Sequence, residues 1–406
     1  MTKLKEYKMF IDGEWLESES KKKFETLNPE NNEPWAAVPE ASTKDVDKAV
    51  KAAQKAFEGK WPKLFPKERA KYLKAIADQL RENAELLGKI ETIDTGKLFK
   101  ETKNQANYIA EYYDYYAGLA DKIEGTVLPI DKPNMQVITT RVPIGVVAAI
   151  IPWNSQMLLT AVKLAPALAM GNTIVIKSSE LAPATLFEFA KLIEKTGIPK
   201  GVVNIVSGLG DPCGKALTSH NLVERVAFTG GLETARHIIR NSAENLSQVS
   251  LELGGKSPVA VFEDADQENA LNGITAGIFG ASGQSCIAGS RLYIQNSIYE
   301  DFLEKLQSQT SIFNRSRLAE HTTVQLKIAE VGVLIDTASL LVRENLHEAH
   351  RYIENGDRPS VLDRARWRRD AAYASRCCVQ AVDLIHGVSG ANANYLDNFL
   401  QLRHRD

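Results

Sequence analysis

Four short β-branched runs decide the fold of this chain. They are residues 145–154 (GVVAAIIPWN), 172–179 (NTIVIKSS), 201–208 (GVVNIVSG) and 224–231 (ERVAFTGG). Each run ends in turn residues, and apolar residues recur at helical spacing between the runs. The predicted helices cover residues 158–170, 182–195, 212–218 and 233–241. This alternation predicts an α/β fold, in which helices cover both faces of a parallel sheet.

Polar and glycine residues stand where each of these strands ends. The groups are Trp153-Asn154, residues 177–180 (KSSE), residues 207–210 (SGLG) and residues 229–231 (TGG). Ligands of such sheets bind beyond the carboxyl ends of the strands, so a cofactor crevice is predicted there. Simpler interpretations stay open, because glycines commonly form turns and the 208–214 segment lacks the complete G-x-G-x-x-G spacing. Lys177 is equally consistent with a solvated charge.

Residues 251–291 follow these strands and contain one cysteine in a loop of small residues. Cys286 lies between GQS and IAG, and Glu252 ends an apolar run just before two glycines. A nucleophilic thiol must be partly exposed in a polar or electropositive pocket, and small neighbours let a substrate approach. A cysteine in a glycine-rich loop is also consistent with a packed small apolar side chain. The loop alone does not decide between the two.

The composition indicates a soluble globular protein. A chain of 406 residues is long enough for two or three domains. The net charge of −2 gives no electrostatic reason to expect a nucleic acid or an anionic membrane as a partner. The apolar runs are too short to span a bilayer, and the first residues contain no apolar signal core. Four cysteines in such a length do not make a disulfide framework, so a cytoplasmic location is expected.

The sequence of the first 142 residues predicts short strands, followed by helices and then by an exposed hairpin. Strands and turns are expected over residues 1–40, and helices over 42–59, 67–96 and about 100–120. The last of these helices carries five tyrosines, which suit core packing, subunit packing or a wall of a substrate tunnel. Apolar and polar residues alternate over residues 126–142, which also contain two prolines. This pattern suits an exposed arm that reaches another subunit.

Six motifs, taken in order, resemble the NAD(P)-dependent aldehyde dehydrogenase superfamily. They are IIPWN, VIKSSE, SGLGDPCG, AFTGG, LELGGKSP and GQSCIAGSR. The similarity covers about residues 8–306 and implies a Rossmann-like parallel sheet of the aldehyde dehydrogenase type. It implies that Cys286 is the nucleophile, that Glu252 is the general base, and that Asn154 donates to the oxyanion together with the Cys286 backbone N–H.

The same resemblance implies the cofactor, the substrate class and a homo-oligomer. NAD is expected, NADP remains possible, the substrate is an aldehyde, and no metal site is predicted. Lys177 and Glu180 would bind the adenosine ribose. The implied cofactor-binding residues are Ile151, Trp153, Lys177, Glu180, Gly210, Gly214, Phe228, Gly230, Gly231 and Leu253. The sequence departs from common members of the superfamily at Ser178, Gly231 and Ala235, which leaves the choice between NAD and NADP open.

The similarity ends near residue 306, and the composition changes at the same place. Residues 1–306 hold 29 Lys and 7 Arg, whereas residues 307–406 hold 1 Lys and 12 Arg. The Glu-x-Phe-Gly-Pro segment of the superfamily is missing. Helices are predicted instead over 318–355, 361–386 and 395–402, with Gly356 ending the first and Ser360 capping the second. About residues 320–406, with two long helices and the ending VSGANANYLDNFLQLRHRD, resemble the C-terminal helical bundle of flavin-dependent monooxygenases with the acyl-CoA dehydrogenase fold.

The sequence thus predicts a chimaera with a truncated catalytic lobe and an all-helical tail, joined within residues 307–317. The expected parts are a dinucleotide-binding domain (1–125 and 146–253), an oligomerisation arm (126–145), a partial catalytic domain (254–306) and the helical tail (307–406). The favoured hypothesis is an aldehyde-oxidising oxidoreductase that acts through a cysteine thiohemiacetal and thioester. The first alternative is a catalytically impaired chimaeric dinucleotide-binding protein. The second alternative, ranked below the first, is a fragment of a flavin-dependent monooxygenase.

Overall fold

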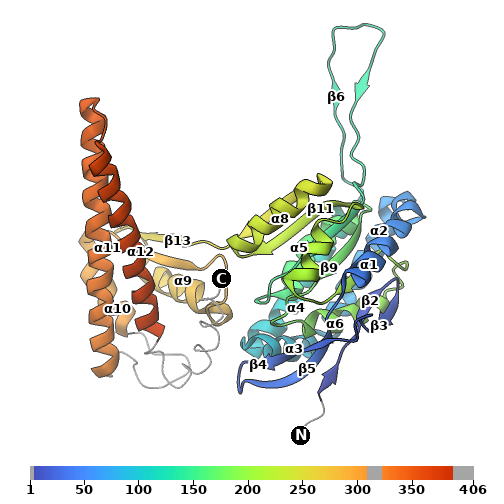
Figure 1. Cartoon of the computed structure of the whole chain (residues 1–406), viewed down its shortest axis with the longest axis horizontal. Coiled ribbons are helices and arrows are strands. Elements are labelled where there is room, and N and C mark those ends of the chain that lie inside the picture. The colour runs from blue at the N-terminus through green and yellow to red at the C-terminus, as the bar shows by residue number, and fades with distance from the viewer. Residues whose placement is uncertain (1–3, 309–321, 387–406) are drawn as a thin grey trace. The chain divides into compact units, whose positions relative to one another are not determined.

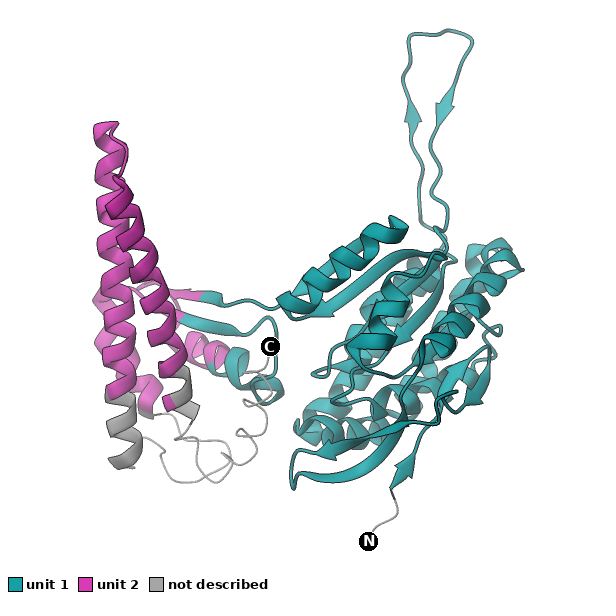
Figure 2. Ribbon diagram, viewed as in Figure 1, with its two compact units in different colours: residues 1–258, 275–291, 406 teal, residues 259–274, 292–405 magenta. Residues whose placement is uncertain are grey.

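The computed structural model describes residues 4–308 and 322–386, which fold into two compact units. Unit 1 comprises the residues up to 258 together with 275–291 (Figure 2). Unit 2 comprises residues 259–274 and the residues from 292 onward. The four-part division drawn from the sequence stays a prediction. The predicted joint lies almost wholly outside the described residues, and the third tail helix (395–402) lies entirely outside them.

Unit 1 is built on a seven-stranded sheet with the order β12-β11-β8-β9-β10-β2-β3. The five strands from β8 to β12 run parallel, and β2 pairs with β10 in the antiparallel sense. The parallel sheet predicted from the sequence is therefore confirmed, with a β2–β3 hairpin added at one edge. The strands are β2 (Met9–Ile11), β3 (Glu14–Leu16), β8 (Val146–Ile150), β9 (Thr173–Lys177), β10 (Val203–Val206), β11 (Val223–Gly230) and β12 (Gln248–Leu253).

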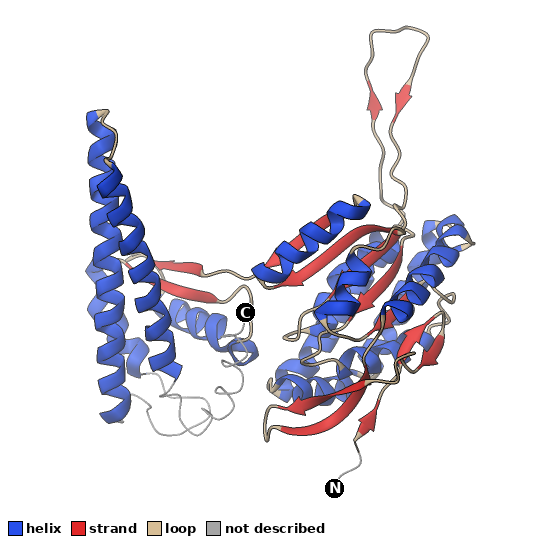
Figure 3. Ribbon diagram, in the orientation of Figure 1, coloured by secondary structure: helices blue, strands red, loops and turns tan. Residues whose placement is uncertain are grey.

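Helices cover both faces of this sheet, as predicted (Figure 3). Successive residues of a strand point to opposite faces, so Val147 and Ala149 of β8 join one core and Val146 and Ala148 join the other. One face packs against α2 (Pro66–Glu82), α4 (Phe99–Leu119), α5 (Gln156–Ala169) and α6 (Ala184–Lys195). The other face packs against α1 (Thr43–Glu58), α7 (Lys215–Thr218) and α8 (Leu232–Asn245).

Two helix predictions need correction. The helix predicted over 67–96 is two helices, α2 and α3 (Ala84–Thr95), separated at Asn83. The Asn83 side-chain amide and backbone N–H both donate to the Gln79 carbonyl, at 2.8 and 3.1 Å, and the backbone of Asn83, with φ −113° and ψ +16°, departs from the helix there. The helix predicted over 212–218 begins only at Lys215, after a turn η2 (Gly210–Gly214) in which Asp211 is extended.

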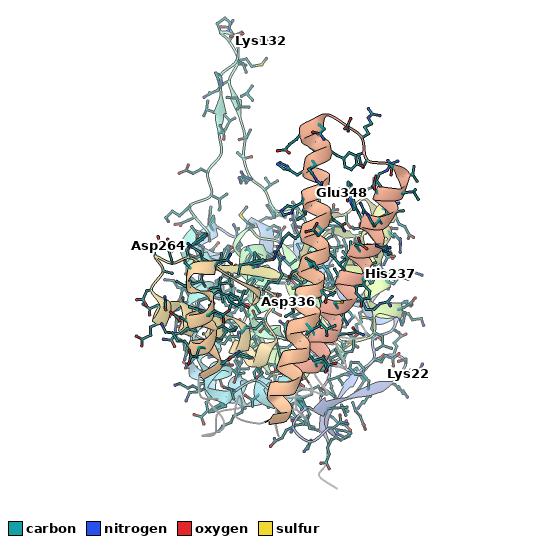
Figure 4. All side chains as sticks on the ribbon, turned by 90° about the vertical axis from the view of Figure 1, so that its left-hand side faces the viewer. Lys22, Lys132, His237, Asp264, Asp336 and Glu348 are labelled. Atoms are coloured by element: carbon teal, nitrogen blue, oxygen red, sulfur yellow. The ribbon has the colours of Figure 1, made fainter. Side chains whose placement is uncertain are left out.

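Smaller elements complete unit 1. The N-terminal residues also form a three-stranded sheet of β1 (Lys5–Glu6), β4 (Lys23–Asn28) and β5 (Glu33–Pro39), and η1 (Trp61–Lys63) precedes α2. The predicted hairpin is present as β6 (Val127–Leu128) and β7 (Val137–Ile138), an antiparallel pair that projects from the unit (Figure 1). Its side chains are largely exposed, and Lys132 lies at its tip (Figure 4).

Unit 2 contains a small α/β cluster and a helical hairpin. Strands β13 (Ser257–Val261) and β14 (Gly289–Ile294) pair, and Val261, Leu271 and Phe302 form a small core. The helices of this unit are the first part of α9 (Gln267–Phe279), η4 (Asn296–Ile298), α10 (Tyr299–Ser308), α11 (Thr322–Asn355) and α12 (Val361–His386). The end of α9 and the turn η3 (Gly280–Gly283) belong to unit 1. The turn between the last two helices follows the prediction, because Gly356 has a φ of +71° and Ser360 caps α12. None of the described helices meets the length and apolarity needed to cross a membrane.

Candidate active site

The carboxyl ends of the parallel strands lie at one edge of the sheet. Lys177 pairs with Ile150 on one side and with Val206 on the other, and its carbonyl accepts from the Ile151 N–H at 3.1 Å. On β11 and β12, Gly230 pairs with Leu253. The structure therefore places Ile151, Lys177, Gly230 and Leu253 at the edge where a parallel sheet binds its ligands.

Lys177 and Glu180 form a partly open charged pair at this edge. The Lys177 Nζ lies 3.3 Å from the Glu180 Oε2 and 3.1 Å from the Ser178 carbonyl. The Lys177 side chain is buried, whereas 41% of the Glu180 side chain is exposed. A Cβ on Gly214 would lie 3.8 Å from the lysine stem, and a Cβ on Gly210 would meet nothing within 4 Å. An open surface beside a carboxylate and an ammonium suits the hydroxyl groups of a ribose.

The turn after β11 depends on a glycine. A Cβ on Gly230 would lie 2.5 Å from the ring of Phe228, which is itself buried. The ring can occupy this position only because residue 230 has no side chain. Gly231 then starts α8 in extended backbone. Phe228, Gly230 and Gly231 therefore shape one short turn at the sheet edge.

The Cys286 loop is anchored on the segment between α3 and α4. The buried Gln284 side chain donates to the Thr95 carbonyl at 2.7 Å, and Ser282 donates to the Gly96 carbonyl at 3.3 Å. The Ala281 N–H donates to Glu101 at 3.2 Å. Cys286, two residues beyond Gln284, is exposed. A fixed loop with an exposed sulfur suits a thiol that must meet a substrate.

Asn154 approaches this loop from the turn after β8. Its amide Nδ2 lies 2.6 Å from the Gln284 carbonyl oxygen, to which it donates. The predicted oxyanion donor and the predicted nucleophile therefore lie on adjacent segments, although 132 positions separate them in the sequence. This arrangement agrees with an amide that supports negative charge beside the sulfur.

Lys163 completes the cluster and was missed by the sequence analysis. Its Nζ on α5 donates to the Thr229 hydroxyl at 2.5 Å, and Thr229 is the β11 partner of Glu252. Burial lowers the pKa of Lys163 to about 8, and the negative charges of Glu252 and Cys286 partly oppose this shift. Lys163 is thus electrostatically coupled to the thiol and the carboxylate together. A lysine within the apolar run QMLLTAVKLAPALA was the sequence signal for it.

Lys97 is a second residue that the sequence analysis missed. It is buried, and its Nζ lies 2.5 Å from Glu91 Oε1, 3.2 Å from Ser155 Oγ and 3.3 Å from Gln105 Oε1. Ser155 directly follows Asn154. Residues 95–97 therefore bind the Cys286 loop through two backbone carbonyls and the Asn154 turn through the lysine ammonium.

Comparison with known proteins decides the family. The model of the Aldehyde dehydrogenase family matches residues 15–333. The chain belongs to this family. It is 53% identical over 304 residues to the (Z)-2-((N-methylformamido)methylene)-5-hydroxybutyrolactone dehydrogenase of Acinetobacter baylyi, covering 75% of this chain and 62% of that protein. It is 43% identical to the betaine aldehyde dehydrogenase of Bacillus subtilis, covering 73% of this chain and 61% of that protein.

Solved aldehyde dehydrogenases share the fold. The NAD⁺ complex of the Bacillus cereus aldehyde dehydrogenase matches with a TM-score of 0.74 and 38% identity, over 81% of this chain and 69% of that one. A second family model, Acyl-CoA dehydrogenase, C-terminal domain, matches residues 286–406. The resemblance to aldehyde dehydrogenases is thus confirmed, and the second model agrees with a tail of the acyl-CoA dehydrogenase type. The chain spans only about 62% of the length of the curated aldehyde dehydrogenases that it matches.

The coupling of Lys163 to the cluster gives a testable pH dependence. A nearby ammonium stabilises negative charge on a sulfur, so Lys163→Met should slow the alkylation of Cys286 at pH 7 roughly threefold. The difference in alkylation rate between Lys163→Met and wild type should become smaller as the pH rises through about 8, where Lys163 itself loses its charge. Iodoacetamide kinetics on a Cys378→Ala background measure this change.

Lys163→Arg is the matched control, because it keeps the positive charge and should keep the wild-type profile. An alkylation profile of Lys163→Met that coincides with wild type would show that the ammonium does not act on the sulfur.

Proposed function

We propose that this chain oxidises an aldehyde to a carboxylate with NAD, using Cys286 as the nucleophile. Two contacts in unit 1 support the proposal, one between Asn154 and the Cys286 loop and one between Lys163 and Thr229, the strand partner of Glu252. The Asn154 amide contacts the Cys286 loop at 2.6 Å, and Lys163 is coupled to both the thiol and Glu252. The membership of the family supports the same chemistry.

Each group has a defined task in this reaction. The Cys286 thiolate attacks the aldehyde carbon, and the Asn154 amide and the Cys286 N–H bind the oxyanion of the thiohemiacetal. Loss of hydride from that carbon leaves a thioester on the sulfur. Glu252 takes a proton from a water molecule, the resulting hydroxide attacks the thioester carbon, and the thiolate leaves as the carboxylate product forms.

The residues at the sheet edge fit a dinucleotide. When NAD is bound, its nicotinamide supplies the hydride acceptor. Glu180 accepts from ribose hydroxyls, and its negative charge disfavours the 2′-phosphate of NADP, so NAD is the preferred cofactor and NADP the alternative. The open space at Gly210 and the turn at Gly230 and Gly231 leave room for the cofactor beside the strands. A cytoplasmic location and a homo-oligomer that uses the 126–145 arm belong to the same proposal.

One observation favours a second candidate function. The chain spans about 62% of the length of its aldehyde dehydrogenase relatives, and the family model of a different protein class covers its C-terminal part. The Aldehyde dehydrogenase family model ends at residue 333, and the residues that follow match the other class. The alternative is therefore a dinucleotide-binding protein that turns over slowly or not at all.

An assay of NADH release over a panel of aliphatic, aromatic and cationic aldehydes separates the two functions when NAD binding is measured in parallel by calorimetry. The aldehyde dehydrogenase proposal expects NADH with at least one aldehyde. Tight NAD binding with no NADH from any aldehyde would support the alternative.

Glu252→Gln tests the hydrolytic step. The variant should still form the thioester once, giving a burst of NADH near one per active site, while steady turnover falls about 10²-fold or more. Rapid-quench fluorescence measures both phases. A variant that turns over at the wild-type rate would remove Glu252 from the role of general base.

A further inference from the structure

The backbone just before Gln284 has an unusual conformation. Ala281, Ser282 and Gly283 have φ angles of +54°, +56° and +73°, which lie in the left-handed region. Glycine adopts this region readily, whereas alanine and serine rarely do. Such backbone persists only where its surroundings hold it, and it is concentrated near functional sites. The contacts that hold this turn therefore indicate which of its residues matter for function.

Three hydrogen bonds tie the turn to neighbouring segments. The Ala281 N–H and the Ser282 hydroxyl donate at 3.2 and 3.3 Å. The Gln284 Nε2 donates to the Thr95 carbonyl at 2.7 Å, and Gln284 is only 4% exposed. The Gln284 bond is thus the shortest of the three, and a buried side chain makes it.

The other half of the Gln284 amide is unsatisfied. Its Oε1 is buried and has no hydrogen-bond partner among the described residues. A buried acceptor without a partner destabilises a fold, and a methionine of similar size would avoid this loss. A side chain that merely filled the space would therefore be apolar. The presence of glutamine is explained by its Nε2 donor.

The backbone carbonyl of Gln284 is bonded in turn to Asn154. The Asn154 Nδ2 donates to it at 2.6 Å. An amide nitrogen carries two hydrogens, so one N–H remains for another acceptor. If the amide were turned over, its Oδ1 would face the carbonyl oxygen, and two acceptors cannot bond each other. The Gln284 carbonyl therefore sets which end of the Asn154 amide lies against the Cys286 loop.

We propose that Gln284 is a positioning residue for the oxyanion donor. Its side chain fixes the loop on Thr95, and its carbonyl fixes the Asn154 amide in the orientation that presents an N–H. This role rests on those proposed above for Asn154 and Cys286, and Gln284 acts through Asn154 alone. Without the Thr95 bond the carbonyl moves, the amide can turn over, and an amide oxygen would repel the developing oxyanion.

Two reagents that react differently with Cys286 test this role in the full-length chain on a Cys378→Ala background. With p-nitrophenyl acetate, the thiolate attacks the carbonyl carbon and a tetrahedral oxyanion forms. The C–O bond then breaks, and p-nitrophenolate leaves with its electron pair. With iodoacetamide, a C–S bond forms as iodide leaves, and no oxyanion arises. Only the acylation therefore depends on the oxyanion donor.

Gln284→Met keeps the size of the side chain and removes its donor. It should slow the burst of p-nitrophenolate at least about tenfold, since a displaced amide stabilises the oxyanion less. Alkylation by iodoacetamide should stay within about twofold of the wild-type rate, because that reaction passes through no oxyanion. Ser285→Ala is the matched control. It changes the next residue of the same loop, leaves the bond to Thr95 in place, and should keep both rates.

A double-variant cycle shows whether Gln284 acts through Asn154. Asn154→Ala alone should slow the burst about 10²-fold. Adding Gln284→Met should slow it by less than about twofold more, because the amide that Gln284 orients is already absent. If the two losses multiplied instead, Gln284 would not act through Asn154, and the proposal would be overturned.

Two further outcomes would overturn it. Gln284→Asn withdraws the same amide by one methylene and should also slow the burst, which keeps the test usable if Gln284→Met misfolds. A wild-type burst in these variants would show that the Thr95 bond does not position the donor. Equal losses of acylation and alkylation would show a general role in the fold. The burst needs neither NAD nor an aldehyde, so a chain that acylates but never releases NADH would contradict the proposed function and leave this test intact.

Discussion

Replacing Cys286 by alanine should lower the rate of NADH formation by more than about 10³-fold, while NAD still binds. The covalent step requires the sulfur, and no neighbouring group can replace a thiolate as the attacking atom. Because Cys286 is exposed, loss of its sulfur creates no cavity and should shift the melting temperature by no more than about 1–2 °C. NADH release and calorimetric NAD binding, measured side by side, check the result.

The matched control is Cys378→Ala, since Cys378 is the other exposed cysteine among the described residues. It belongs to α12 of unit 2 and is not one of the predicted site residues, so its replacement should leave NADH formation unchanged. A Cys286→Ala variant that retained a substantial fraction of the rate would contradict the assignment of the nucleophile. If wild type and variant both bind NAD and neither forms NADH, the dinucleotide-binding alternative holds.

Much of unit 1 was predictable because its signals are local. Buried parallel strands are continuous β-branched runs, and a helix start such as Ser42 shows in a few residues. The Ser42 hydroxyl accepts from the Asp45 N–H at 3.3 Å, and the Asp45 carboxylate accepts from the Ser42 N–H at 2.7 Å. The break at Asn83 was not predicted, since a single asparagine within a long periodic run is weak evidence for a helix end.

The site was predictable only in part, for a related reason. Cys286, Glu252 and Asn154 stand in recognisable motifs, whereas Lys163 and Lys97 are single lysines in helical or loop sequence. Such lysines are usually solvated. Only the tertiary structure shows that Lys163 of α5 contacts Thr229 of β11, and that Lys97 contacts Ser155 of the Asn154 turn. Buried polar partners from distant segments leave no periodic signal in a sequence.

The helical tail illustrates a different limit. The two helices that the structure describes there could be placed from their periodicity and caps, and α12 begins and ends where the sequence predicted. What these helices pack against could not be predicted, because an amphipathic stripe specifies an apolar neighbour without identifying it. The two family models overlap over residues 286–333. The matches therefore describe the origin of the tail, and they do not identify what its helices pack against.

Lys97→Met is expected to lower the free energy of unfolding by about 3–5 kcal/mol, because it leaves the Glu91 carboxylate buried without its cation. The Lys97 and Glu91 side chains are 2% and 0% exposed, so water cannot replace the lost partner. Glu91 Oε2 already has no hydrogen-bond partner. The variant should also lose at least about tenfold in kcat, since a shift in the Asn154 turn weakens stabilisation of the oxyanion. Urea unfolding and steady-state kinetics measure the two effects.

The double variant Lys97→Met with Glu91→Gln separates stability from positioning. Neutralising Glu91 removes the uncompensated charge, so a large part of the lost stability should return. The contact with Ser155 does not return, because it depends on the Lys97 ammonium alone. The kcat deficit should therefore persist in a protein that is again stable, with NAD affinity near wild type. If kcat recovered together with stability, Lys97 would merely support the fold. If Lys97→Met lowered the free energy of unfolding by less than about 1 kcal/mol, the result would contradict a buried ion pair between Lys97 and Glu91.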